Sequence, residues 1–127
     1  MITLAEENYL KAIWAISLNT NEKTSTNAIA DEISTSAASV SDMLRKLQEK
    51  ELIKYEKYKG VELSEKGRNL ATSIIRKHRL WETFLVNKLA FNWGEVHDVA
   101  EQLEHIKSDE LVDKLDSFLG FPKFDPH

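Results

Sequence analysis

The side chains most able to do chemistry are His97, Glu101, Glu104 and His105, which lie in a segment with helical apolar spacing. At about 100° per residue, the four fall within one arc of roughly 100° of the helix surface. The apolar residues, beginning with Val96, occupy a separate arc, so the four are expected on a face that does not pack. Two imidazoles and two carboxylates form a borderline nitrogen and oxygen donor set, which suits Mn, Fe, Co, Ni or Zn. A solvated charged face is an equally good interpretation of this stripe taken alone.

A second group of the same chemistry is His78 with Glu82. The two residues are one helical turn apart and therefore share a face of a helix. Taken alone, such a pair is better interpreted as a surface pair. The chain has four histidines, and three of them lie on carboxylate-rich helical faces. The two groups together therefore favour one or two metal sites.

The composition predicts a small intracellular protein of one domain, or of two subdomains that share a core. The chain has 127 residues, of which 42% are hydrophobic, and it has no cysteine. The lack of cysteine excludes disulfides and thiolate metal sites. No apolar run approaches the roughly 20 residues that cross a bilayer, and the N-terminus lacks a signal-peptide pattern. We therefore expect a cytoplasmic protein with no membrane contact.

The formal net charge of -4 conceals a segregation of charge along the chain. Residues 45–59 carry six basic and three acidic side chains, whereas residues 95–116 carry eight acidic side chains and two lysines. A cationic and an anionic region indicate two different partners. Phosphate suits the first region, and metal cations suit the second.

The first half of the chain has the pattern of a helix-turn-helix. A capping box at Thr3 and Glu6 opens an amphipathic helix. A short helix over 27–33 follows, and after a polar turn a longer helix extends over 37–50. Two helices joined by a tight turn match a helix-turn-helix. If only these helices are considered, any small helical bundle explains them equally well.

That next segment predicts a β-hairpin. Residues 53–56 and 61–64 alternate apolar and polar side chains with a period of two. The connecting residues 57–60 include Gly60, which can take a positive φ. A hairpin directly after a helix-turn-helix is the wing of a winged helix, and its cationic, aromatic tip suits a phosphate backbone. The alternative interpretation of a basic tip is simple solubility.

The helix over 37–50 then becomes the recognition helix. Its first residues are small or hydroxylated, which allows close approach to the major groove. Direct readout is sparse, so we expect DNA shape to carry part of the specificity. The predicted DNA contacts are Thr26, Asn27, Ser36, Ala37, Ala38, Ser39, Ser41, Asp42, Arg45, Lys46, Lys57, Tyr58 and Lys59.

The second half of the chain is predicted to be helical throughout. A long helix over 65–89 is followed by a break at Trp93 and Gly94, by the helix that carries His97, and by a last helix capped by Ser108. The region has more apolar surface than a three-helix unit of its size hides, which favours a dimer interface; the alternative is that this surface covers the winged helix. The predicted fold is mainly α, with a winged helix-turn-helix DNA-binding domain over 1–70 and a helical metal-binding and dimerisation domain over 71–127.

Motifs spread over the whole chain resemble the diphtheria-toxin-repressor and manganese-transport-regulator family of metal-dependent transcriptional regulators. The most specific segments are 6–10 (EENYL), 39–44 (SVSDML), 55–60 (YEKYKG), 76–80 (RKHRL) and 96–105 (VHDVAEQLEH). Many members of that family continue into an SH3-like C-terminal domain, and whether the native chain does so is left open. His127 is expected to be a loop residue.

The resemblance implies two metal sites. One matches His78, Glu82 and His97; the other, whose occupancy couples to DNA binding, matches Asn8, Glu101, Glu104 and His105. Asn8 can bind a metal only through its neutral carbonyl oxygen. Glu101 stands where iron-type members have cysteine, and this harder ligand favours manganese or ferrous iron. Lys11 stands where manganese-type members have a carboxylate, so a close binuclear centre is not expected.

The sequence therefore predicts a metal-dependent DNA-binding regulator that is not an enzyme. We expect a homodimeric repressor of metal-uptake genes on a palindromic double-stranded operator, with Mn2+ or Fe2+ as corepressor and no small organic substrate. Zn2+, Co2+ or Ni2+ are expected to substitute in vitro. One alternative is a metal-independent winged-helix regulator that senses an organic ligand. Another is a metalloenzyme, against which the chain lacks a His-Glu-x-x-His pattern and a glycine-rich phosphate loop.

Overall fold

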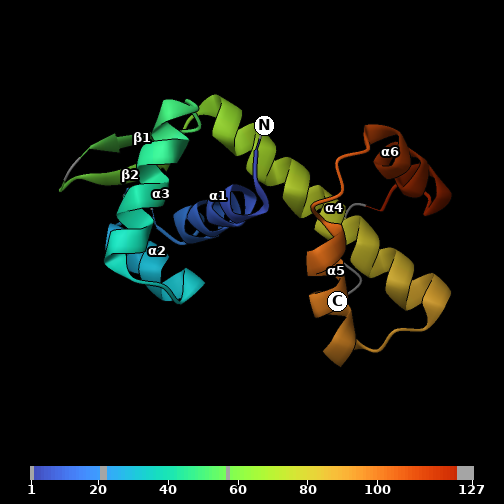
Figure 1. Cartoon of the computed structure of the whole chain (residues 1–127). Helices are drawn as coiled ribbons and strands as arrows, with labels where there is room; N and C mark the ends of the chain where they lie inside the picture. The colour runs from blue at the N-terminus through green and yellow to red at the C-terminus, as the bar shows by residue number, and fades with distance from the viewer. Residues whose placement is uncertain (1, 21–22, 57, 123–127) are drawn as a thin grey trace. The chain divides into compact units, whose positions relative to one another are not determined.

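The computed structural model describes residues 2–20, 23–56 and 58–122 (Figure 1). The chain divides into two compact units, Met1–Thr72 and Ser73–His127. The predicted fold class is confirmed, since helices dominate and a small hairpin follows the third helix. The elements, in order, are α1 (Leu4–Ser17), α2 (Thr26–Ile33), α3 (Ala37–Glu49), β1 (Ile53–Glu56), β2 (Gly60–Leu63), α4 (Glu65–Leu89), α5 (Trp93–Leu103) and α6 (Asp109–Phe118).

The capping box that opens α1 is confirmed. The Thr3 side chain accepts a hydrogen bond from the backbone N–H of Glu6, and the Glu6 carboxylate accepts one from the backbone N–H of Thr3. Two of the N–H groups that every helix start leaves unbonded are thus satisfied. The face of α1 that carries Leu10 and Ile13 is fully buried.

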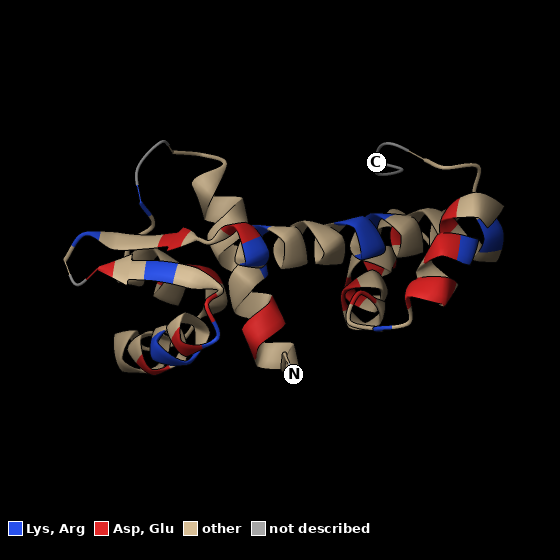
Figure 2. Cartoon of the chain, turned by 90° about the horizontal axis from the view of Figure 1, so that it is seen from above, with Lys and Arg blue, Asp and Glu red and all other residues tan. Residues whose placement is uncertain are grey.

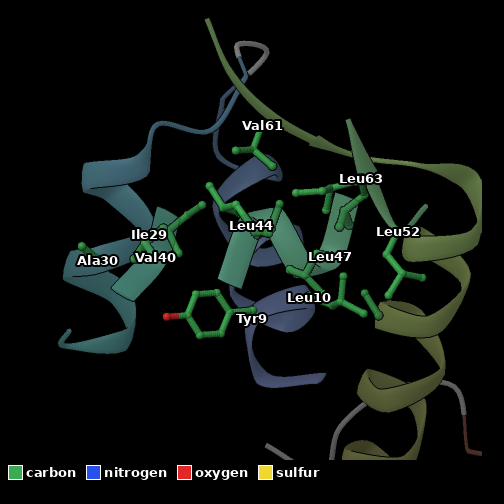
Figure 3. Close-up of a cluster of buried hydrophobic side chains, with 13 residues drawn as sticks. Tyr9, Leu10, Ile29, Ala30, Val40, Leu44, Leu47, Leu52, Val61 and Leu63 are labelled. Atoms are coloured by element: carbon green, nitrogen blue, oxygen red, sulfur yellow. The ribbon is translucent and has the colours of Figure 1, made fainter. Parts of the chain in front are cut away.

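Serine side chains begin both helices of the helix-turn-helix. Ser25 caps α2 and Ser36 caps α3, each by accepting from a backbone N–H in the first turn. Ser34 ends α2 in the left-handed conformation, with φ 62°. This reversal turns the chain, so that α3 packs against α2, and its Val40 and Leu44 join the core of the first unit (Figure 3).

The hairpin pairs β1 with β2 in antiparallel register, Ile53 opposite Leu63 and Glu56 opposite Gly60. Its inner side chains, among them Val61, join the core of the first unit (Figure 3). An isolated bridge joins Val61 to Thr24, which lies just before α2. Thr24 is thereby held against β2.

The second unit consists of the rest of α4 with α5 and α6. This unit has two small hydrophobic clusters. Leu80 of α4 packs with α6 in one of them, and Leu85 of α4 packs with α5 in the other, so α4 contributes to both. The predicted Ser108 cap of α6 is confirmed. The predicted break at Trp93 is wrong: Asn92 caps α5, and Trp93 is its first residue. Within the described ranges, no helix is long and apolar enough to cross a membrane.

Candidate functional site

The three residues that the resemblance assigns to one metal site lie together in the second unit. His78 and Glu82 come from α4, and His97 comes from α5. Nε2 of His78 lies 3.1 Å from Oε1 of Glu82, and Nδ1 of His97 lies 3.7 Å from its Oε2. One ligand atom from each residue lies within 4.8 Å of the others. The Glu82 carboxylate therefore lies between two imidazoles. In this arrangement, all three side chains can bind the same cation.

Burial differs sharply among these three side chains. Glu82 is 2% exposed and His78 is 12% exposed, whereas His97 is 60% exposed. A buried carboxylate is costly unless a proton, a cation or hydrogen bonds compensate its charge. Two imidazole nitrogens and one carboxylate form a donor set for a divalent metal of borderline character, and they leave further coordination positions for other ligands. The residues present thus fit manganese or ferrous iron.

Glu104 adds a fourth side chain to this group. It is fully buried, and its Oε1 lies 2.7 Å from Nδ1 of His78. A carboxylate that accepts a hydrogen bond from Nδ1–H directs the lone pair of Nε2 outward. In His78, Nε2 faces Glu82, so a cation between the two could take the Nε2 lone pair. His105 lies next to the same carboxylate, with Nε2 3.7 Å from Oε2 of Glu104.

The predicted common face of α5 is wrong in one respect. The helix ends at Leu103, Glu104 is its C-cap, and a turn follows. His97 and Glu101 lie one turn apart with exposed side chains, 3.9 Å from each other, whereas Glu104 is buried against α4. Periodicity alone does not show where a helix ends or which neighbour covers its last residues.

Asn8 lies on α1 in the first unit and is half-buried. Its assignment to a second metal site with Glu101, Glu104 and His105 remains a prediction.

The start of α3 presents the small side chains that were predicted to contact DNA. Ser36, Ala37, Ala38 and Ser39 are all exposed. The Ser36 hydroxyl caps the helix by accepting from the N–H of Ser39 at 3.1 Å, and it also donates to the Ser39 hydroxyl at 3.0 Å. A helix end that carries only small side chains can approach a base edge closely.

The other predicted DNA contacts divide by exposure. Asp42 pairs with Arg45 at 3.5 Å, and both are largely exposed. Ser41 and Thr26 are half-buried, whereas Asn27, Lys46, Tyr58 and Lys59 are exposed. The predicted positions Lys57 and His127 lie outside the described residues.

One cation near the hairpin was missed by reasoning from the sequence. Lys23 lies next to the wing because Thr24 pairs with Val61, and its Nζ lies 3.8 Å from Oε1 of Glu56. No local pattern predicts a pairing across this distance in the chain.

Models of two domains match the chain, each along its own half. Residues 1–61 match the iron dependent repressor N-terminal DNA binding domain, and residues 64–127 match the iron dependent repressor metal binding and dimerisation domain. The chain belongs to the iron-dependent repressor family. The resemblance expected from the sequence motifs is thereby confirmed.

Individual relatives agree with this assignment. An uncharacterized HTH-type transcriptional regulator of Methanocaldococcus jannaschii is 32% identical over 113 residues, covering 89% of this chain and 90% of that protein. The diphtheria toxin repressor of Corynebacterium jeikeium is 39% identical over 87 residues, covering 68% of this chain but only 36% of that protein. A solved manganese-dependent transcriptional repressor in complex with manganese is 45% identical, with a TM-score of 0.85 over 96% of this chain and 56% of that one.

The chain thus spans little more than half, or less, of several proteins that it matches. The family consists of transcriptional regulators, and its second domain is named for metal binding. Of the alternatives, the metal-independent regulator is therefore not favoured.

Proposed function

We propose that this protein is a DNA-binding repressor that Mn2+ or Fe2+ activates. The observation that carries the proposal is the group of His78, Glu82 and His97, a borderline donor set in a chain whose first half matches a family DNA-binding domain. The relatives support both metals, since one solved relative binds manganese and the family is named for iron. We infer that the repressed genes encode metal uptake, because a metal that acts as corepressor then lowers its own uptake when it is plentiful.

The proposed DNA partner is a palindromic duplex bound by a homodimer in the cytoplasm. The family name of the second domain includes dimerisation. A two-fold dimer presents two recognition helices, and it therefore reads half-sites about one helical turn apart or a multiple of that spacing. The exposed small residues at the start of α3 supply the groove contact. An enzymatic activity is not part of the proposal.

Metal activates such a protein only if it binds the DNA-competent form more tightly than the other form. His78, Glu82 and His97 would hold the ion, which would supply the positive charge that their carboxylate and imidazole donors attract. Of the three side chains, Glu82 is the most buried, so the positive charge of the ion would compensate its carboxylate most. The coupling is reciprocal, so operator DNA should also tighten metal binding.

Operator binding measured as a function of metal concentration tests the proposal. The probe is a palindromic duplex enriched by the manganese-loaded protein from a randomised library, titrated at fixed salt with Mn2+, Fe2+ or a chelator. We expect either metal to tighten binding at least tenfold, which is about 1.4 kcal/mol of coupling. The double variant H78A/H97A should lose this response, whereas Glu95→Gln on the same helix as His97 should keep it. Equal affinity in chelator and in metal would refute the proposal.

A further inference from the structure

Two lysines from different segments share one carboxylate at the wing. Nζ of Lys59 lies 3.4 Å from Oε2 of Glu56, and Nζ of Lys23 lies 3.8 Å from its Oε1. The side chain of Lys59 is 73% exposed, that of Glu56 is 56% exposed and that of Lys23 is 35% exposed. One carboxylate thus bridges two ammonium groups at the surface. Acidic as well as basic residues occur along the hairpin (Figure 2).

The backbone fixes this arrangement. Thr24 and Val61 exchange two hydrogen bonds, of 2.9 Å and 2.8 Å, which hold Lys23 beside β2. Gly60 lies opposite Glu56 in the hairpin and has φ 104°. A Cβ atom at Gly60 would lie 2.9 Å from the Thr24 carbonyl oxygen and 3.0 Å from Cβ of Lys23, so this close approach requires glycine.

A small pocket of about 150 Å³ lies at the same place. It is lined by Lys23, Ser25, Thr26, Tyr55, Tyr58, Lys59 and Gly60. Its side chains offer two ammonium groups and four hydroxyl groups as donors, and none of them is acidic. Such a lining suits an anion that only accepts hydrogen bonds, of which a backbone phosphate of nucleic acid is the example that fits a winged helix.

We propose that Lys23 and Lys59 bind one backbone phosphate of the operator at this pocket, and that Glu56 is the internal counterion which this phosphate displaces. The inference rests on the proposed function, since it concerns the DNA complex. With Glu56 present, the two lysines and the carboxylate carry a net charge of +1; without it they would carry +2. Glu56 therefore reduces the number of counterions that DNA releases and keeps affinity low enough for metal to control it.

The variant Glu56→Gln tests this directly. Binding of manganese-loaded protein to the palindromic duplex is measured over a series of salt concentrations. We expect Glu56→Gln to bind at least about threefold more tightly at low salt, with a log–log salt slope steeper by about one per protomer. Glu62→Gln is the matched control, because it removes the same charge from the same hairpin. Glu62 makes no ion pair with any residue in the described ranges, and its change should have a smaller effect on the slope.

A double-mutant cycle separates displacement of Glu56 from a general charge effect. In the background K23Q/K59Q, the further change Glu56→Gln should leave affinity and slope almost unchanged, because both lysines that pair with this carboxylate in the described ranges are gone. An effect that persists in this background, or an equal effect of Glu62→Gln, would overturn the inference. An unchanged slope for Glu56→Gln would overturn it as well. Failure of the wild-type protein to bind the duplex in manganese would instead refute the proposed function.

Discussion

Nδ1 of His78 lies 2.7 Å from Oε1 of Glu104, a carboxylate with no exposed surface. Glu104 follows the last residue of α5, and His78 is in the middle of α4. A hydrogen bond from Nδ1–H to this carboxylate favours the tautomer that can bind a cation through Nε2, on the side that faces Glu82. Glu104 thereby orients a candidate metal ligand even before any ion is bound.

This relationship predicts that Glu104→Gln weakens manganese binding by about 10- to 100-fold, because a neutral amide holds the His78 tautomer less strongly. Isothermal titration with Mn2+ measures the loss. In the metal-free protein, the 15N chemical shift of His78 Nδ1 should change in Glu104→Gln, because its hydrogen-bond partner changes from a carboxylate to an amide, and loss of a direct metal ligand alone would not produce this change. Glu110→Gln, which removes an exposed carboxylate paired with Lys114, is the control. Unchanged manganese affinity in Glu104→Gln would contradict the prediction.

Because His97 is exposed, we expect its loss to affect manganese binding but not the stability of the fold. His97 is 60% exposed, so His97→Ala should weaken manganese binding while it changes the free energy of unfolding by less than about 0.5 kcal/mol. Leu80→Ala, at a fully buried position of the same unit, should cost about 2–5 kcal/mol. Urea unfolding in chelator measures both values. Strong destabilisation by His97→Ala would show that the imidazole has a packing role.

The contact between Glu6 and Lys50 predicts a pH-dependent contribution to stability. Lys50 Nζ lies 2.7 Å from the buried Glu6 carboxylate and joins the start of α1 to the C-cap of α3. Burial by itself would raise the pKa of Glu6, but hydrogen bonds from Lys50 and Thr3 outweigh it, so the pKa lies below its usual value of 4.5. Glu6→Gln should therefore cost about 2 kcal/mol near neutral pH.

The sign of the pH dependence follows from the lowered pKa. Below the usual value the unfolded chain binds the proton more readily than the folded chain does, so stability rises with pH in that range. The contribution of Glu6 is complete above the unfolded pKa and is lost as pH falls through the folded pKa. Unfolding curves of wild type and Glu6→Gln should thus converge in acid. A constant difference at every pH would contradict this account, and Glu49→Gln at an exposed position of α3 is the control.

Two glycines in helices should respond to alanine in opposite ways. A Cβ atom at Gly67 would lie 2.0 Å from the carbonyl oxygen of Leu52, whereas one at Gly94 would have, among the described residues, a single neighbour within 4 Å, the Asn92 side chain at 3.5 Å. Alanine normally stabilises a helix by about 1 kcal/mol relative to glycine. We therefore expect Gly94→Ala to be neutral or stabilising, and Gly67→Ala to lower the thermal midpoint because the start of α4 must move away from Leu52. Equal behaviour of the two variants would contradict the close approach.

Much of the fold could be predicted from the sequence because the deciding interactions are local. The Thr3–Glu6 capping box and the Ser108 cap depend on residues three positions apart. The His78–Glu82 pair depends on one helical turn, and the hairpin depends on a period of two. Interactions of this range are set by backbone geometry that is the same in every protein.

The remaining features depend on tertiary structure. Glu104 faces His78 across 26 positions, and Lys50 reaches Glu6 across 44 positions. Lys23 meets Glu56 only because Thr24 joins the edge of the wing. Periodicity assigned Glu104 to an open face, but α4 covers it. The sequence alone determined which donor types this protein carries and that His78 and Glu82 lie one helical turn apart. The packing of α4 against α5 decided which donors share one site, because contacts between distant residues arise only when buried surfaces pack together.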